Sequence, residues 1–129
     1  MNMLSLVVPV YRNEGSIPDL LAAIGELAQN IGMRFEAVLV VDGSPDRSYE
    51  LLRDRLPHCS FASQLIVLSR NFGSFPAIRA GLQAGKGSIF AVMAADLQEP
   101  PELVLEMARI LAANQADVTL GVRRQRNDP

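Results

Sequence analysis

The sequence predicts an α/β protein with a mainly parallel sheet and helices on both faces, and two observations lead to this class. The first is a series of short, apolar and largely β-branched segments without strict alternation, which is typical of strands covered on both sides. The second is that segments with helical periodicity separate these strands, which favours crossover connections and parallel pairing. The expected strands are residues 4–10, 35–41, 64–68, 89–93 and 118–121.

The clearest helical pattern follows the first expected strand. Apolar residues recur with a period of 3.6 over residues 17–31, Ser16 precedes them as a suitable N-cap, and Gly32 is placed to end the helix. We expect three further helices, in residues 48–56, in residues 74–84 and from Leu103 to Leu111, the last with Pro101 in its first turn.

Length and composition indicate one globular domain over residues 1–129. An apolar fraction of 49% and a charged fraction of 20% are ordinary for a folded domain. The net charge of −2 gives no basis for a nucleic-acid partner. A single cysteine, Cys59, cannot form an internal disulfide, and neither a signal peptide nor a membrane-spanning stretch is evident. We therefore expect a soluble, cytoplasmic protein.

The sequence places polar loops at one edge of this sheet. In doubly wound sheets, ligands bind beyond the carboxyl ends of the strands. Taken alone, each loop has the residues of an ordinary turn. Asp96, in the segment VMAADLQEPPELV, is either a turn residue or a carboxylate that holds a ligand. Their shared edge favours a binding site. The loops that follow the five strands are residues 11–16, 42–46, 69–73, 94–98 and 123–126.

Two common nucleotide-binding motifs are absent. No G-x-G-x-x-G follows the first strand, which argues against a dinucleotide fingerprint. The segment GLQAGKG resembles a phosphate-binding loop, but its glycines are one residue too close and no Ser or Thr follows Lys86.

Four motifs together resemble family 2 glycosyltransferases. They are VVPVYRNEGSIPDLL, VVDGSPDRS, LSRNFGSFPAIRAGL and ADLQEPPELV, which occur in the family's order and spacing over nearly the whole chain. The branch that the chain resembles is that of the dolichyl- and undecaprenyl-phosphate sugar transferases. The resemblance implies a GT-A fold that binds a nucleotide-diphosphate-sugar donor and a divalent cation at the carboxyl edge of the sheet.

The resemblance also implies a metal site in the fourth loop. Asp96 and Gln98 match the family's acidic motif, so they are the expected ligands of Mg²⁺ or Mn²⁺, which prefer oxygen donors. Ala94 stands where the family usually has a first carboxylate. The resemblance therefore implies a metal site with one carboxylate fewer than the family usually has.

The same resemblance implies where the donor binds. The ring of Tyr11 is suited to stack on a nucleobase, and carboxylates can accept hydrogen bonds from the base or the ribose. Val41 departs from the family, which often has Asp or Asn there. The implied donor-binding residues are Pro9, Tyr11, Glu14, Asp42, Ser44 and Asp96, and the implied phosphate-binding residues are Arg123 and Arg124.

Relatives in this family continue past the segment that matches residues 121–129 into an acceptor-binding half. We therefore expect this chain to be the donor-binding half of an inverting glycosyltransferase of cell-envelope polysaccharide or glycolipid synthesis, with no catalytic base of its own. A polyprenyl phosphate is the expected acceptor, and self-association is expected through the face that the other half would cover. Two alternatives stay open: a non-catalytic nucleotide- or partner-binding module, and an unrelated doubly wound regulatory domain.

Overall fold

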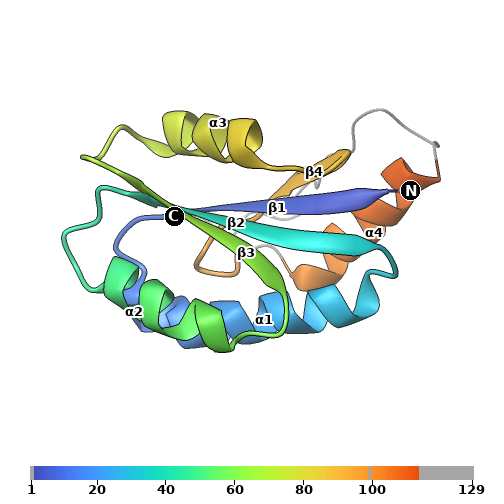
Figure 1. The fold of residues 1–129 in the computed structure, drawn as a ribbon, viewed down its shortest axis with the longest axis horizontal. Helices are drawn as coiled ribbons and strands as arrows, with labels where there is room; N and C mark the ends of the chain where they lie inside the picture. Colours follow the sequence, from blue (N-terminus) through green and yellow to red (C-terminus); the bar gives the residue numbers. More distant parts are fainter. Residues whose placement is uncertain (1, 99, 114–129) are drawn as a thin grey trace, which may run out of the picture.

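The computed structural model describes residues 2–98 and 100–113 of the chain, in which strands and helices alternate (Figure 1). The strands are β1 Met3–Val10, β2 Arg34–Asp42, β3 Ala62–Leu68 and β4 Ile89–Val92. The helices are α1 Ile17–Asn30, α2 Ser48–Arg55, α3 Ser74–Ala84 and α4 Pro101–Ala112, with short 3-10 turns at Glu14–Ser16 and Leu56–His58.

All strand pairs are parallel, and the sheet has the order β3-β2-β1-β4. The central strands β1 and β2 pair over eight residues, from Met3 with Arg34 to Val10 with Val41. This order brings the carboxyl ends of all four strands to one edge, as the alternation of elements predicts.

Helices cover both faces of the sheet. In Figure 1, α3 lies on one face, while α1, α2 and α4 lie on the other. The smaller apolar cluster on the α3 face is made of Val7, Val38, Val40 and Ala77. The larger cluster on the opposite face includes Leu6, Val8, Leu39, Ile24 and Val104.

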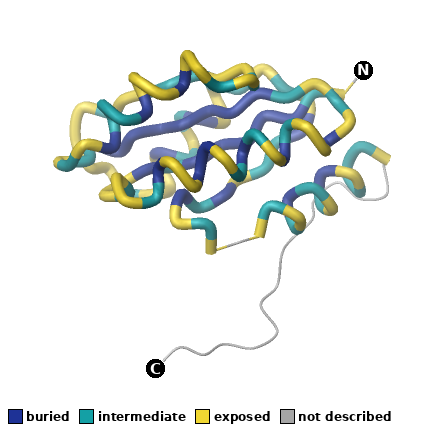
Figure 2. Tube along the Cα trace, turned by 90° about the horizontal axis from the view of Figure 1, so that it is seen from below, coloured by how far each residue is buried: buried dark blue, intermediate teal, exposed yellow. Residues whose placement is uncertain are grey.

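Side chains of β1 and β2 are buried from both sides, and Figure 2 shows the trace of these strands in dark blue behind exposed outer helix surfaces. Each fully buried aliphatic side chain contributes ~1.5–3 kcal/mol to the stability of the fold. The two apolar clusters therefore make the central strands a rigid base for the loops at their ends.

Most predicted elements are confirmed to within a few residues, with one correction at the start of α1. Ser16 is the N-cap residue, but its hydroxyl makes no capping bond. Ser16 Oγ lies instead within hydrogen-bonding distance of two carbonyl oxygens, Asn13 O (3.1 Å) and Ala95 O (3.2 Å). Gly32 follows α1 with a φ of 70°, and Pro101 is the first residue of α4. The predicted strand 118–121 lies outside the described residues.

No helix within residues 2–98 and 100–113 has both the length and the apolar character needed to cross a membrane.

Candidate functional site

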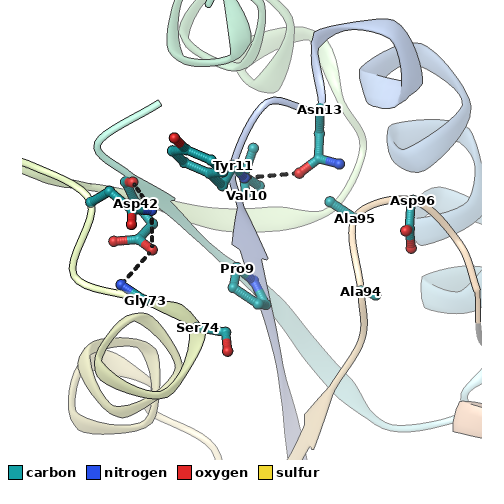
Figure 3. A pocket seen from close by; sticks show the side chains of 11 residues that line it. Pro9, Val10, Tyr11, Asn13, Asp42, Gly73, Ser74, Ala94, Ala95 and Asp96 are labelled. Carbon is teal, nitrogen blue, oxygen red and sulfur yellow. Dashed lines mark hydrogen bonds between the residues drawn. The ribbon is translucent and has the colours of Figure 1, made fainter. Parts of the chain in front are cut away.

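A pocket of about 320 Å³ lies at the carboxyl edge of the sheet (Figure 3). Residues from four loops or strand ends surround it, which confirms that the polar loops converge at one edge. Its lining consists of Pro9, Val10, Tyr11, Asn13, Asp42, Asn71, Gly73, Ser74, Ala94, Ala95 and Asp96.

The first loop follows β1 and presents the aromatic side of the pocket. Tyr11 is 39% exposed, and the Arg12 guanidinium lies 5.4 Å from its ring centroid. Tyr11 N donates to Asn13 Oδ1 at 2.8 Å, a bond drawn in Figure 3. Arg12 has a φ of 55°, which is uncommon for a residue with a side chain and marks a constrained turn.

The end of β2 joins the pocket to the third loop through Asp42. Its carboxylate is buried and accepts hydrogen bonds from Phe72 N (2.8 Å), Gly73 N (3.0 Å) and Asn71 Nδ2 (3.1 Å). These donors occupy both carboxylate oxygens. Asp42 therefore shapes the pocket wall by holding the third loop against the end of the sheet.

Gly43 allows this close contact between the second and third loops. Its φ is 62°, and an ideal Cβ at this position would lie 2.1 Å from the backbone carbon of Arg70. Only glycine adopts this conformation without a steric penalty and leaves room for the neighbouring backbone.

A second carboxylate, Asp46, connects the second loop to the first. Asp46 Oδ2 accepts from Glu14 N at 3.2 Å, and Asp46 Oδ1 accepts from Ser48 N at 3.1 Å and from Ser44 Oγ. Burial alone would raise the pKa of the Asp46 carboxyl, but the hydrogen bonds from Ser44, Ser48 and Glu14 lower it from 3.8 to about 2. Asp46 is therefore a carboxylate at neutral pH.

The fourth loop carries the exposed carboxylate of the site. β4 ends beside β1, where Met93 N donates to Val7 O at 3.0 Å, and Ala94 and Ala95 then line the pocket. Asp96 is exposed, and among the described residues its carboxylate accepts one hydrogen bond, from Gln98 N at 3.3 Å. Leu97 between them has a φ of 60°, so this loop also holds a residue in the left-handed region.

The structure brings together four of the residues predicted to bind the donor: Pro9, Tyr11, Asp42 and Asp96 all line the pocket. Glu14 and Ser44 are not lining residues: Glu14 N donates to Asp46 Oδ2, and Ser44 Oγ accepts from Arg12 N at 2.8 Å. Gln98 is next to Asp96 but is not a lining residue. Arg123 and Arg124 lie outside the described residues.

Sequence reasoning did not select four polar or glycine positions in the lining, Asn13, Asn71, Gly73 and Ser74. Their loops were expected at this edge, so their position in the sequence indicated that they could lie near the site. Their residue types did not indicate a ligand-binding role, because Asn, Gly and Ser are also the ordinary residues of turns.

The pocket can hold a flat polar ligand. Tyr11 and Pro9 provide an aromatic and an apolar surface, Asn13 and Asn71 provide amides, and Asp96 provides negative charge. No group of three or more His, Cys, Asp or Glu side chains suited to a metal occurs within residues 2–98 and 100–113. A cation here would need further ligands beyond Asp96 and its neighbours.

Comparison with known proteins gives a family match over most of the chain. The family model described as Glycosyl transferase family 2 matches residues 5–129. Two curated relatives bear the name undecaprenyl-phosphate 4-deoxy-4-formamido-L-arabinose transferase. The one from Pseudomonas paraeruginosa is 39% identical over 130 residues, covering 99% of this chain and 38% of the relative. The one from Aeromonas hydrophila is 38% identical, covering 99% and 39%. The chain thus spans about two fifths of the length of these relatives.

Solved structures confirm the predicted GT-A-like fold. S. aureus TarS 1-349 in complex with UDP-GlcNAc superposes with a TM-score of 0.75 at 20% identity, covering 98% of this chain and 37% of that one. The mannosyltransferase PcManGT from Pyrobaculum calidifontis, in complex with GDP-Man and Mn²⁺, superposes with a TM-score of 0.74 at 22% identity, covering 84% and 32%.

Proposed function

Since the chain belongs to glycosyl transferase family 2, we propose that it binds the nucleotide-diphosphate-sugar donor of a sugar-transfer enzyme. The observation that carries this proposal is the pocket at the carboxyl edge, where an aromatic ring, side-chain amides and an exposed carboxylate meet. The solved structures with UDP-GlcNAc and with GDP-Man support a nucleotide sugar as the ligand class.

The nucleoside end of the donor is assigned to the first and third loops. Tyr11 stacks on the base, and the Asn13 and Asn71 amides offer donors and acceptors to its edge or to the ribose. Asp42 contributes mainly through the third loop, because its oxygens already accept three hydrogen bonds. Which base the pocket selects follows from these amides rather than from Val41, which is buried in the core.

The residues of the fourth loop fit a divalent cation that is shared with the diphosphate. Asp96 is exposed at the pocket, and Gln98 adds an amide oxygen two residues away. Mg²⁺ and Mn²⁺ commonly bind one or two carboxylates and complete their coordination with phosphate oxygens and water, so a three-carboxylate cluster is not required. Such a cation, when bound, neutralises charge on the leaving diphosphate.

The acceptor is proposed to be a polyprenyl phosphate, on the strength of the names of the curated relatives. In the transfer, an acceptor phosphate oxygen attacks the anomeric carbon while the bond to the nucleotide diphosphate breaks, with inversion. This chain's part is to bind and orient the donor at Tyr11 and Asp96. Arg123 and Arg124 would contact phosphates, and the reaction would take place at the cytoplasmic face of the membrane.

The test is the metal dependence of nucleotide binding. We expect UDP or GDP to bind in the presence of Mn²⁺ and Asp96→Ala to abolish the metal-dependent part, because Gln98 alone supplies one neutral oxygen to a doubly charged ion. Isothermal titration with and without Mn²⁺ measures both quantities. Asp19→Ala, on the exposed side of α1, is the matched control and should bind as the parent does.

If Asp96→Ala keeps the full Mn²⁺ dependence, Asp96 is not the ligand. Absence of any nucleotide diphosphate binding by the parent would reject the donor-binding function itself. Transfer from a panel of nucleotide sugars to polyprenyl phosphate, followed by mass spectrometry of the lipid, then distinguishes an enzyme from a non-catalytic binding module.

A further inference from the structure

Three successive backbone N–H groups of the first loop donate to side chains of the second loop and α2. A loop lacks the regular backbone hydrogen bonds of a helix or sheet, so side chains that accept from its backbone N–H groups order it. The bonds join Arg12 N to Ser44 Oγ (2.8 Å), Asn13 N to Ser48 Oγ (3.2 Å) and Glu14 N to Asp46 Oδ2 (3.2 Å).

Asp46 is the common acceptor behind these bonds. Ser44 Oγ donates its hydrogen to Asp46 Oδ1, and a hydroxyl has one hydrogen, so the lone pairs of Ser44 are left to accept from Arg12 N. Ser48 N also donates to Asp46 Oδ1, which places the Ser48 side chain beside the first loop. Asp46 thus accepts directly from Glu14 N and also bonds to the two serines that accept from Arg12 N and Asn13 N.

The held segment lies at the pocket, whereas Asp46 does not. Tyr11 and Asn13 line the pocket on either side of Arg12, whose φ of 55° requires support from surrounding contacts. Ser48 is fully buried and also outside the lining. Neither Asp46 nor Ser48 lines the pocket, and both bond to the first loop, so the first loop is the direct connection between them and a ligand.

We infer that Asp46 is a positioning residue, which fixes the first loop in the conformation that presents Tyr11 and Asn13 to the nucleoside part of the donor. The inference rests on the proposed donor-binding function for the identity of the ligand. It adds a residue whose own side chain contacts neither donor nor metal.

The first measurement needs no ligand. Asp46→Asn keeps the size of the side chain but places an amide NH₂ among N–H and O–H donors, so it cannot accept all the present bonds. Residue-resolved amide hydrogen exchange should be faster at Arg12, Asn13 and Glu14 by about tenfold or more, while β1 and β2 amides keep their protection. Asp54→Asn, at an exposed position of α2, should leave these three amides unchanged.

The second measurement is titration of UDP and GDP with Mn²⁺. The dissociation constant should rise about tenfold in Asp46→Asn, a change of ~1.4 kcal/mol. Ser48→Ala, a smaller change that removes the acceptor of Asn13 N, should raise it in the same direction. Glu36→Gln, far from the pocket, destabilises the fold by another route and should keep the parent constant, which separates positioning from a general loss of stability.

Parent-like exchange at all three amides in both Asp46→Asn and Ser48→Ala would overturn the inference. Parent-like dissociation constants in both variants would overturn it as well. If the parent binds neither UDP nor GDP, the proposed function fails, and the exchange result alone decides whether Asp46 holds the loop.

Discussion

The strand β2 carries one buried carboxylate near each end, and the two ends have different surroundings. Glu36 and Asp42 are both 3% exposed. They lie on the same face of β2 because side chains alternate along a strand, and Val38 and Val40 between them pack against α3. The comparison is therefore between two like groups on one face of one strand.

Each carboxylate holds one end of α3. Glu36 accepts from Lys86 N (2.6 Å) after the helix, and also from Ser5 Oγ (2.6 Å) and Gln64 Nε2 (3.0 Å). Asp42 accepts from the backbone before the helix and from the Asn71 side chain. Both ends of α3 are thus tied to β2 by charge-assisted hydrogen bonds, which are stronger than neutral ones.

The difference lies in what surrounds these bonds. Asp42 lines the pocket, whereas Glu36 is at the opposite edge of the sheet. A buried, well-bonded carboxylate is therefore not by itself a sign of a ligand site. The carboxyl edge is distinguished by an open pocket, by the exposed Asp96 and by the left-handed residues Arg12 and Leu97.

The largest expected effect comes from Gly43→Ala, which should disrupt the contact between the second and third loops at the carboxyl edge and leave the opposite end of the sheet unchanged. A Cβ there would meet the Arg70 backbone at 2.1 Å, and the φ of 62° is unfavourable for alanine. We expect a loss of about 3 kcal/mol in the free energy of unfolding and loss of nucleotide binding. Urea unfolding and titration with UDP and Mn²⁺ measure the two effects.

Gly25→Ala is the matched control for this change. Gly25 lies in α1, with nothing within 4 Å of an ideal Cβ. Alanine should raise the free energy of unfolding by about 0.5–1 kcal/mol, since it favours the helix. Equal effects of the two substitutions would mean that the contact between the second and third loops does not constrain the pocket.

The next prediction compares the two carboxylates directly. Glu36→Gln and Asp42→Asn each replace a carboxylate that accepts three hydrogen bonds with an amide that cannot accept them all, so each should lower the free energy of unfolding by about 2 kcal/mol. Only Asp42→Asn should also weaken nucleotide binding, because the third loop forms the pocket wall. Weaker binding in Glu36→Gln would show that the two ends of α3 are coupled and that the comparison fails.

The contrast between the two ends also shows what sequence can predict. The sheet, the helices and the convergence of the loops follow from apolar periodicity, which is a property of the sequence itself. Glu36 within the apolar segment FEAVLVV was a visible signal of a buried polar network, but its partners Ser5 and Gln64 come from other strands. Which side chains meet depends on strand register, which the pattern alone does not give.

The site shows the same limit. Tyr11 and Asp96 were predicted from the motifs and line the pocket, and their roles stay predictions. Ser44 and Glu14 were also predicted as donor-binding residues, but neither lines the pocket: Ser44 Oγ accepts from Arg12 N, and Glu14 N donates to Asp46. A motif identifies residues that belong together; it does not separate those that face the ligand from those that support them.

A smaller effect is expected from acid. Burial opposes ionisation of Glu36, but the hydrogen bonds from Ser5, Gln64 and Lys86 and the Lys86 charge lower its pKa below the ordinary 4.5. Hydrogen bonds likewise lower the pKa of Asp46 to about 2. Lowered pKa values stabilise the fold above the unfolded-state values, and this stability is lost as pH falls through the folded-state values.

The free energy of unfolding should therefore decline as pH is lowered from about 4.5 towards 2. Glu36→Gln should flatten the decline that begins below 4.5, and Asp46→Asn should flatten the part from 3.8 down to about 2. Urea unfolding followed by circular dichroism at a series of pH values measures the slopes. If the curves of unfolding free energy against pH for both variants run parallel to that of the parent, Glu36 and Asp46 are not the source of the decline.

The smallest expected effect is a gain of metal binding at the carboxyl edge. Ala94 lines the pocket two residues before Asp96, and the family resemblance of the sequence implies a carboxylate at this position. Ala94→Asp should tighten Mn²⁺ binding in the presence of UDP by about fivefold, ~1 kcal/mol, because a second carboxylate adds charge near the ion. The position is half-buried at an open pocket, so the added carboxylate can stay hydrated and the fold should tolerate it. Ala22→Asp, on the exposed side of α1, is the matched control for added charge. An unchanged Mn²⁺ affinity in Ala94→Asp would mean that residue 94 does not face the cation, and the metal site would then have to be built around Asp96 from other oxygen donors.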